Sequence, residues 1–276
     1  MARQKRIALI NDITGFGRCS VAVQLPLISA MRVQACPLPT AILSVHTGFP
    51  NHYLDDYTDR MRPYMENWAA NALEFDAILT GFLGSERQIE VVLECIARFK
   101  QRTTQLVVDP VMGDNGSLYS SYTPALCAKM RQLLPQADVV TPNLTEACQL
   151  LGADYPTGGL VTEDELARMA AAIAAMGPRT VIITGLHADE NVRTYLYADG
   201  CGRSFDNPKV GRDRSGAGDA FSAIIAAALV RGIPLAEGVP RAADFIGHCL
   251  TYAEELDLPW NYGLPFEEFM GELTIL

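Results

Sequence analysis

The sequence lacks the signatures of zinc-bound, disulfide-bonded and membrane-spanning proteins. Its seven cysteines contain no CxxC pair, and its four histidines contain no HExxH motif. This spacing predicts neither a zinc site nor a disulfide framework. The longest apolar run, residues 220–230 interrupted by Ser222, is well short of the ~20 residues that cross a bilayer. Only five residues separate the basic segment 1–6 from Asp12, too few for the apolar core of a signal peptide. We therefore expect a soluble cytoplasmic protein that has no membrane partner.

Positive charge is also scarce. Lys and Arg number 22 against 32 Asp and Glu, which gives a net charge of −10 and a sequence pI near 4.9. No stretch clusters enough Lys or Arg to follow a phosphate backbone, so we expect no nucleic-acid partner. An anionic ligand would have to be held locally, by backbone N–H groups or a metal ion, against an unfavourable overall field.

Both common nucleotide-binding loops are missing. None of the four lysines follows a glycine, which excludes a Walker A loop. The segment Gly15-Phe16-Gly17 has Ser20 where a GxGxxG motif requires its last glycine. A nucleotide site in this chain must therefore be built from other parts.

The sequence does contain an alternation of short apolar runs and helical periods. Hydrophobic residues make up 49% and charged residues 20%, as expected for a chain with a substantial core. Capping-box patterns begin at Ser85 and Thr162. The alternation predicts an α/β fold in which helices cover both faces of a mostly parallel sheet, and we expect residues 1–276 to form a single domain. The expected strands are Ile7–Ile10, Ala77–Thr80, Leu106–Asp109, Val139–Thr141 and Thr180–Thr184, with a small antiparallel hairpin of Arg193–Ala198 and Arg203–Phe205 around Asp199–Gly202.

Polar side chains follow three of these strands. Asp109 and Asp114 come after one strand, Asn143 and Glu146 after the next, and Thr184 at the end of a third. Ligands of open α/β sheets gather at the carboxyl ends of strands. Oxygen-bearing side chains at these positions suit a hydrated Mg²⁺, and phosphate oxygens would complete its octahedral coordination. The alternative is that Asp109 and Asn143 only cap the turns that follow them.

A second feature is Arg214–Phe221, read as RSGAGDAF, directly before an apolar helix expected over Ala220–Arg231. Small residues at a helix start let backbone N–H groups point at an anion, and the helix dipole adds to their attraction. Asp219 in the first turn is placed to take a proton from a hydroxyl that attacks a bound phosphoryl group. Alternatively, Gly216–Asp219 is a tight turn whose Asp stabilises the dipole.

Together these motifs resemble the pyridoxal kinase family of the ribokinase superfamily. The matching residues are Asp109–Asp114 with Gly116 and Tyr119, Thr141–Asn143 with Glu146, Met176–Pro178, and Gly216–Asp219, in the family's order from Ile7 to about Gly232. The resemblance implies an ATP-dependent kinase with a three-layer α/β/α ribokinase-like fold that needs Mg²⁺, often a monovalent cation such as K⁺, and usually forms a homodimer.

The resemblance also implies roles for individual residues. Asp219 would be the catalytic base, and the N–H groups of Gly216, Ala217 and Gly218 would form an anion hole. Asn143 and Glu146, together with Asp109, would hold Mg²⁺. Asp109 and Asp114 would lie along the triphosphate of ATP, and Thr184 near its phosphates or ribose.

On the vitamin side, the resemblance implies contacts from Thr14, Thr47 and Phe82, beside Asp219. Thr14–Gly17 and Thr47–His52 are expected to be loops that act as flaps over the site. Two positions depart from the family pattern: Phe82 replaces a common Tyr, and Ala217 replaces a common Thr. The expected reaction is phosphorylation of the hydroxymethyl group of pyridoxal, pyridoxine or pyridoxamine in vitamin B6 salvage. The alternatives are a hydroxymethylpyrimidine (phosphate) kinase of thiamine synthesis, a sugar kinase, and a vitamin-binding protein without turnover.

Overall fold

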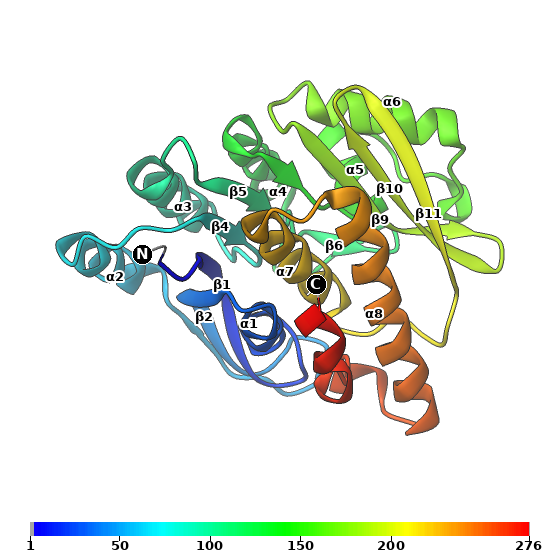
Figure 1. Ribbon diagram of the computed structural model, residues 1–276, viewed down its shortest axis with the longest axis horizontal. Helices are drawn as coiled ribbons and strands as arrows, with labels where there is room; N and C mark the ends of the chain where they lie inside the picture. Colours follow the sequence, from blue (N-terminus) through cyan, green and yellow to red (C-terminus); the bar gives the residue numbers. More distant parts are fainter. Residues whose placement is uncertain (1–2, 276) are drawn as a thin grey trace.

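A nine-stranded sheet separates two layers of helices in the computed structural model, which describes residues 3–275 (Figure 1). The strand order is β11-β10-β9-β8-β5-β4-β1-β2-β3, and the six strands from β9 to β2 run parallel. This confirms the predicted mostly parallel α/β sheet. The strands are β1 (Arg6–Phe16), β2 (Gln34–Val45), β3 (Leu54–Asp56), β4 (Ala77–Thr80), β5 (Gln105–Val108), β8 (Val139–Val140), β9 (Thr180–Ala188), β10 (Asn191–Ala198) and β11 (Cys201–Pro208), with a separate pair β6 (Gly113–Asp114) and β7 (Ser117–Leu118).

Helices cover both faces of the sheet. Helices α1 (Val21–Ala30), α7 (Ala217–Arg231) and α8 (Leu235–Glu255) lie on one face, together with the C-terminal 3₁₀ segment η4 (Glu267–Ile275). The other face carries α2 (Thr58–Ala70), α3 (Glu86–Phe99), α4 (Pro124–Met130), α5 (Leu144–Leu151) and α6 (Glu163–Ala174). Within residues 3–275, no helix has the length and apolar character needed to cross a bilayer.

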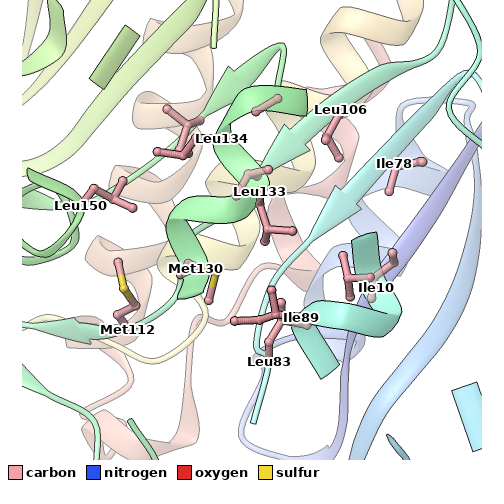
Figure 2. Packing of buried hydrophobic residues seen from close by; sticks show 14 of the residues in the cluster. Ile10, Ile78, Leu83, Ile89, Leu106, Met112, Met130, Leu133, Leu134 and Leu150 are labelled. Carbon is pink, nitrogen blue, oxygen red and sulfur yellow. The ribbon is translucent and has the colours of Figure 1, made fainter. Parts of the chain in front are cut away.

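The core is two apolar clusters, one on each face of the sheet. The central residues of three parallel strands, Ile7–Ile10 of β1, Ala77–Thr80 of β4 and Leu106–Val108 of β5, are buried on both faces, and neighbours such as Leu9 and Ile10 point into opposite clusters. This accounts for their continuous apolar runs. Figure 2 shows the cluster beneath α3 and α4, where Ile10, Ile78 and Leu106 from the sheet face Ile89 and Leu133 from the helical layer.

The antiparallel part of the sheet is larger than the sequence predicted. The hairpin of β10 and β11 turns on two residues, Asp199 and Gly200, and not on the four expected up to Gly202. Both turn residues have positive φ, 51° and 78°. A turn of this kind matches the twist of the flanking strands and lets their pairing extend to Cys201. Strand β9 also continues past Thr184 and pairs antiparallel with β10.

The expectation of a flap loop at Thr14–Gly17 was wrong. Strand β1 continues beyond Ile10 to Phe16, and its partner β2 holds Thr14 opposite Leu43. The ladder shifts register between Asn11 and Ile13. The other expected flap, which contains Thr47, is a connection between β2 and β3 outside regular structure.

One of the two predicted capping boxes is formed. Thr162 and Glu165 satisfy each other's backbone N–H groups at the start of α6. At α3 the Ser85 hydroxyl accepts from the Gln88 N–H as expected, but the Gln88 side chain accepts from the Gly84 N–H. The Gln88 side chain points away from the Ser85 N–H because its amide nitrogen donates to the backbone carbonyl oxygen of Thr40 at 2.8 Å.

Candidate active site

All twelve residues assigned to the site from the sequence line one cavity of about 680 Å³. The cavity lies at the carboxyl ends of the parallel strands, where ligands of open α/β sheets gather. These residues are Thr14, Thr47, Phe82, Asp109, Asp114, Asn143, Glu146, Thr184, Gly216, Ala217, Gly218 and Asp219.

Helix α7 begins at Ala217, three residues earlier than expected, so the small residues form its first turn. Gly216 caps this start in a left-handed conformation, with φ 88° and ψ −5°. A Cβ on Gly216 would lie 2.0 Å from the carbonyl oxygen of Arg18. Only glycine fits both the conformation and the close approach, and this allows the helix to start at the cavity wall.

The first turn of α7 presents backbone N–H groups toward the cavity. The Ala217 N–H has only a long contact, 3.4 Å, to the carbonyl oxygen of Arg214. Gly218 is exposed, and open space lies where its side chain would be. The first N–H groups of a helix have no acceptor within the helix, so this turn can bind an anion.

Two donors orient the carboxylate of Asp219. The Asn11 amide donates to Oδ1 at 3.0 Å, and the backbone N–H of Ser20 donates to Oδ2 at 2.8 Å. Burial raises the pKa of Asp219 to about 6, with the charge of Asp12 adding to the effect and both hydrogen bonds opposing it. The carboxylate is therefore fixed in position and more basic than an exposed aspartate.

Asn11 and Asp12 were not identified from the sequence, although the signal was present. They directly follow the apolar run Ile7–Ile10, as Asp109 follows its own strand. The side-chain oxygen Oδ1 of Asn11 accepts the backbone N–H groups of Asp12 and Phe82, and its side-chain nitrogen Nδ2 donates to Gln24 as well as to Asp219. These four bonds fix the orientation of the amide.

Asn143 caps the turn that follows it, as the alternative interpretation predicted, and both Asn143 and Glu146 line the cavity. They form a capping box at the start of α5, in which the Asn143 oxygen accepts the Glu146 N–H and Glu146 Oε2 accepts the Asn143 N–H, both at 2.9 Å. Glu146 Oε1 accepts the N–H of Met112, and the Asn143 amide donates to the carbonyl oxygen of Gly113. The capping and site interpretations are therefore compatible.

Buried carboxylates make the centre of the cavity strongly unfavourable for additional negative charge. Burial, and after it the neighbouring charge of Asp219, raise the pKa of Asp109 to about 8. Burial also raises the pKa of Glu146 well above its usual range, with Asp109 as the next cause. A cation placed among these groups would offset both effects.

Within residues 3–275, no three His, Cys, Asp or Glu side chains gather into a metal centre. Asp109, Glu146 and the amide of Asn143 are hard oxygen donors at adjacent strand ends, which is the chemistry that Mg²⁺ prefers. Mg²⁺ is commonly held by one or two carboxylates with water and phosphate oxygens, so the residues fit this ion without forming a complete cage.

Another part of the cavity wall combines aromatic rings with a buried acid. Phe82 and Thr47 line it as expected. Thr14, which is only 2% exposed, donates its hydroxyl proton to Asp12 Oδ2 at 2.7 Å, and Ser20 donates to the other oxygen at 2.5 Å. Asp12 is therefore the acidic group at this end, and Thr14 orients it.

The remaining end of the cavity combines polar residues with an apolar surface. Asp114 is exposed on β6, and its carboxylate accepts the Asn115 N–H at 2.8 Å. Thr184 lies next to Asn143 through an isolated parallel bridge. Sequence reasoning did not find the apolar lining, which comes from Val192, Val210, Ala243, Ile246 and Leu250.

Comparison with known proteins agrees with this architecture. Residues 25–261 match the family model described as phosphomethylpyrimidine kinase. The chain belongs to the phosphomethylpyrimidine kinase and pyridoxal kinase family. It is an ATP-dependent kinase of that family, and the ribokinase-like fold implied by its motifs is confirmed.

Individual relatives carry both names. A hydroxymethylpyrimidine/phosphomethylpyrimidine kinase from Rhizobium meliloti is 30% identical over 254 residues, which cover 90% of this chain and 91% of the relative. A proposed phosphomethylpyrimidine kinase from Bacteroides thetaiotaomicron, crystallised with pyridoxal, has a TM-score of 0.93 at 35% identity, covering 99% of this chain and 96% of its own. Pyridoxal kinase from Lactobacillus plantarum has a TM-score of 0.90 at 28% identity, covering 99% and 98%. The pyridoxal kinase of Staphylococcus aureus, 26% identical with a TM-score of 0.78 over 91% of this chain and 89% of its own, has been solved in complex with ADP.

Proposed function

We propose that this kinase transfers the γ-phosphoryl group of ATP to the exocyclic hydroxymethyl group of a B6 vitamer, namely pyridoxal, pyridoxine or pyridoxamine. The product is the 5′-phosphate, and the role is vitamin B6 salvage. The observation that carries the proposal is the Asp219 carboxylate, held by Asn11 and Ser20 at the first turn of α7. A general base directly beside a helix N-terminus suits transfer of a phosphoryl group to an alcohol.

In this proposal Asp219 accepts the proton of the vitamin's hydroxymethyl group as its oxygen bonds to the γ-phosphorus and ADP leaves. The N–H groups of Gly216, Ala217 and Gly218 hold the transferred phosphoryl oxygens. Donors already aimed at the site of developing charge need no reorganisation during the reaction. The aromatic end, with Thr47 and Phe82, receives the flat ring.

The nucleotide occupies the other end of the cavity. The apolar surface around Val192, Ile246 and Leu250 suits a purine ring, and Thr184 and Asp114 line the same cavity. Asp109, Asn143 and Glu146 would hold Mg²⁺, which supplies positive charge against the triphosphate. Burial raises the pKa of Asp109 and Glu146, which shows that this part of the cavity disfavours negative charge. A bound cation would offset that effect.

A hydroxymethylpyrimidine is the second candidate substrate, and Asp12 is the observation that favours it. An exocyclic amine on a pyrimidine ring is a donor that the buried Asp12 carboxylate can accept. The relative from Rhizobium meliloti bears this activity in its name. The segment His46-Thr47-Gly48-Phe49 and the pyridoxal-bound relative support the B6 vitamers.

The test is ATP consumption with each B6 vitamer, hydroxymethylpyrimidine and ribose, with the phosphorylated product identified by mass spectrometry. The proposal predicts the highest kcat/KM for a B6 vitamer. A higher value for hydroxymethylpyrimidine would establish the second candidate. Binding of a vitamer without turnover would indicate a vitamin-binding protein, and preference for ribose would indicate a sugar kinase.

We further propose that the enzyme is a cytoplasmic homodimer of one kinase domain per chain. Phe16, Ile42, Tyr53 and Leu54 expose large apolar surfaces on or beside β1, β2 and β3, at one edge of the sheet. Burying such a patch against a second copy would stabilise the pair. Light scattering of the purified protein measures its mass and tests the dimer directly.

A further inference from the structure

The segment that follows α8 contacts two parts of the cavity wall. The guanidinium of Arg214, two residues before Gly216, donates to the carbonyl oxygens of Leu258 and Pro259 at 2.9 and 3.1 Å. His46 Nε2 lies 2.8 Å from the carbonyl oxygen of Asn261. The segment therefore contacts both the loop that precedes the anion hole and the loop that carries Thr47.

Contacts on the outer side fix the segment in place. Arg18 donates to the carbonyl oxygen of Tyr262 at 3.3 Å. The Tyr262 ring packs edge-on against Phe16, with centroids 4.9 Å apart, and stacks with Phe49 at 6.4 Å. Tyr262 thus packs among its neighbours and is not among the residues that line the cavity.

Trp260 lies in the chain between Pro259 and Asn261, whose carbonyl oxygens make these contacts, and it does not pack on the outer side as Tyr262 does. Its indole lines the cavity and is 46% exposed. A Cβ on Gly48 would lie 2.7 Å from Trp260 Cη2, so the indole reaches the Thr47 loop at the one position there that has no side chain. Among the residues from 3 to 275, none accepts a hydrogen bond from the indole N–H.

We propose that Trp260 is a substrate-contacting residue that selects flat heteroaromatic rings, its indole forming one wall of the ring subsite. The inference rests on the proposed function, because it places the vitamin ring at the Thr47 end of the cavity. The indole face packs against the ring, and the free N–H remains available as a donor to a ring substituent. Ribose has no π-system to stack on the indole, so Trp260 favours aromatic substrates over ribose.

Fluorescence tests this contact directly, since the chain has only two tryptophans. Trp68, 9% exposed, packs against Phe75 and Phe99 in the core. In the Trp68→Phe variant the emission reports on Trp260 alone. We expect pyridoxine or hydroxymethylpyrimidine to quench or shift this emission, with half of the change near the KM of the substrate, and ribose to leave it unchanged.

Kinetics supply the second readout. Trp260→Ala should raise the KM for the ring substrate roughly 3- to 10-fold, which is the worth of one aromatic pair. The KM for ATP should stay within about twofold, and Trp260→Phe should restore most of the loss. Tyr262→Ala is the control for anchoring of the segment, because it removes a ring that packs on Phe16 and Phe49 and does not line the cavity.

Each outcome separates this inference from the proposed function. Unchanged Trp260 emission at saturating substrate, or an equal rise in KM for Tyr262→Ala, would overturn the contact. If no ring compound is phosphorylated but pyridoxine still alters Trp260 emission, the proposed function is wrong, while the contact between Trp260 and the ring is supported.

Discussion

The backbone N–H of Ser20 donates to the carboxylate of Asp219 at 2.8 Å, although the two residues are 199 positions apart in the chain. Ser20 adopts φ 54° and ψ −138°, an unusual backbone conformation for a residue with a side chain. Its hydroxyl donates to Asp12, so one residue joins both acids of the cavity. Because the donor to Asp219 is a backbone group, substitution of the Ser20 side chain would leave that hydrogen bond possible.

Asp219→Asn should lower kcat by roughly 10²–10⁴, the usual contribution of a positioned general base. Both partners of this carboxylate are donors, so the new amide would place its own N–H against one of them and lose a hydrogen bond. We therefore also expect a lower Tm, equivalent to ~1–3 kcal/mol. The affinity for ATP, measured by calorimetry, should change little.

Asp213→Asn is the control for that substitution, because Asp213 lines the same cavity and has only a 3.4 Å contact with Asn115. It should retain most of its turnover. Near-normal turnover of Asp219→Asn with saturating vitamin would place the base elsewhere.

The pH dependence of kcat/KM should show an acid limb near pH 6. Asp219 acts as a base only when it is ionised, and burial raises its pKa to about 6. The ionised fraction, and with it the rate, falls as the pH drops through that value. An acid limb near pH 4, the range of an exposed aspartate, would contradict the assignment.

Asp109→Asn should stabilise the protein without ligands, and more strongly at pH 8 than at pH 5. Burial and the charge of Asp219 raise the pKa of Asp109 from its ordinary value of 3.8 to about 8. Between those values the unfolded chain binds fewer protons at this site than the folded one, so this group lowers stability as the pH rises. Thermal unfolding at both pH values measures the difference, and an equal shift at pH 5 and pH 8 would exclude the charge as the cause.

Glu146→Gln should raise the Mg²⁺ concentration needed for half-maximal activity more than it raises the KM for the vitamin. The substitution removes a charge next to Asp109 and one of the two oxygens that accept the N–H groups of Met112 and Asn143. The second effect is structural and needs its own control. Glu165→Gln changes the same capping-box position on α6, outside the cavity, and should leave the Mg²⁺ requirement unchanged. Equal activity with excess chelator and with Mg²⁺ would refute the metal assignment.

Hydrogen exchange should slow in residues 46–52 when the vitamin binds, because this connection between β2 and β3 carries Thr47 and closes over the ring. Thr14 serves as the internal reference, since it lies within β1 and is buried in the free protein. Its exchange should be slow with and without vitamin. No change across residues 46–52 would exclude a lid there.

The sequence located the parts of the site that follow regular patterns. Asp109 and Asn143 were found because each stands where an apolar strand ends, and Asp219 because small residues precede an apolar helix. Strand β2 contains Pro37 and Pro39, which hide its strand character, and Thr14 then looked like part of a loop. Trp260 left no local signal, because only tertiary packing brings the segment after α8 to the Thr47 loop.

The four hydrogen bonds of Asn11 make the orientation of the catalytic base depend on contacts between distant parts of the chain. Its amide joins the backbone at Phe82, just after β4, to Gln24 on α1 and Asp219 on α7. These elements span more than half of the sequence, and non-local contacts of this kind slow folding. Any partly folded state in which α7 is not docked onto the sheet would lack the Asn11–Asp219 hydrogen bond that orients the base.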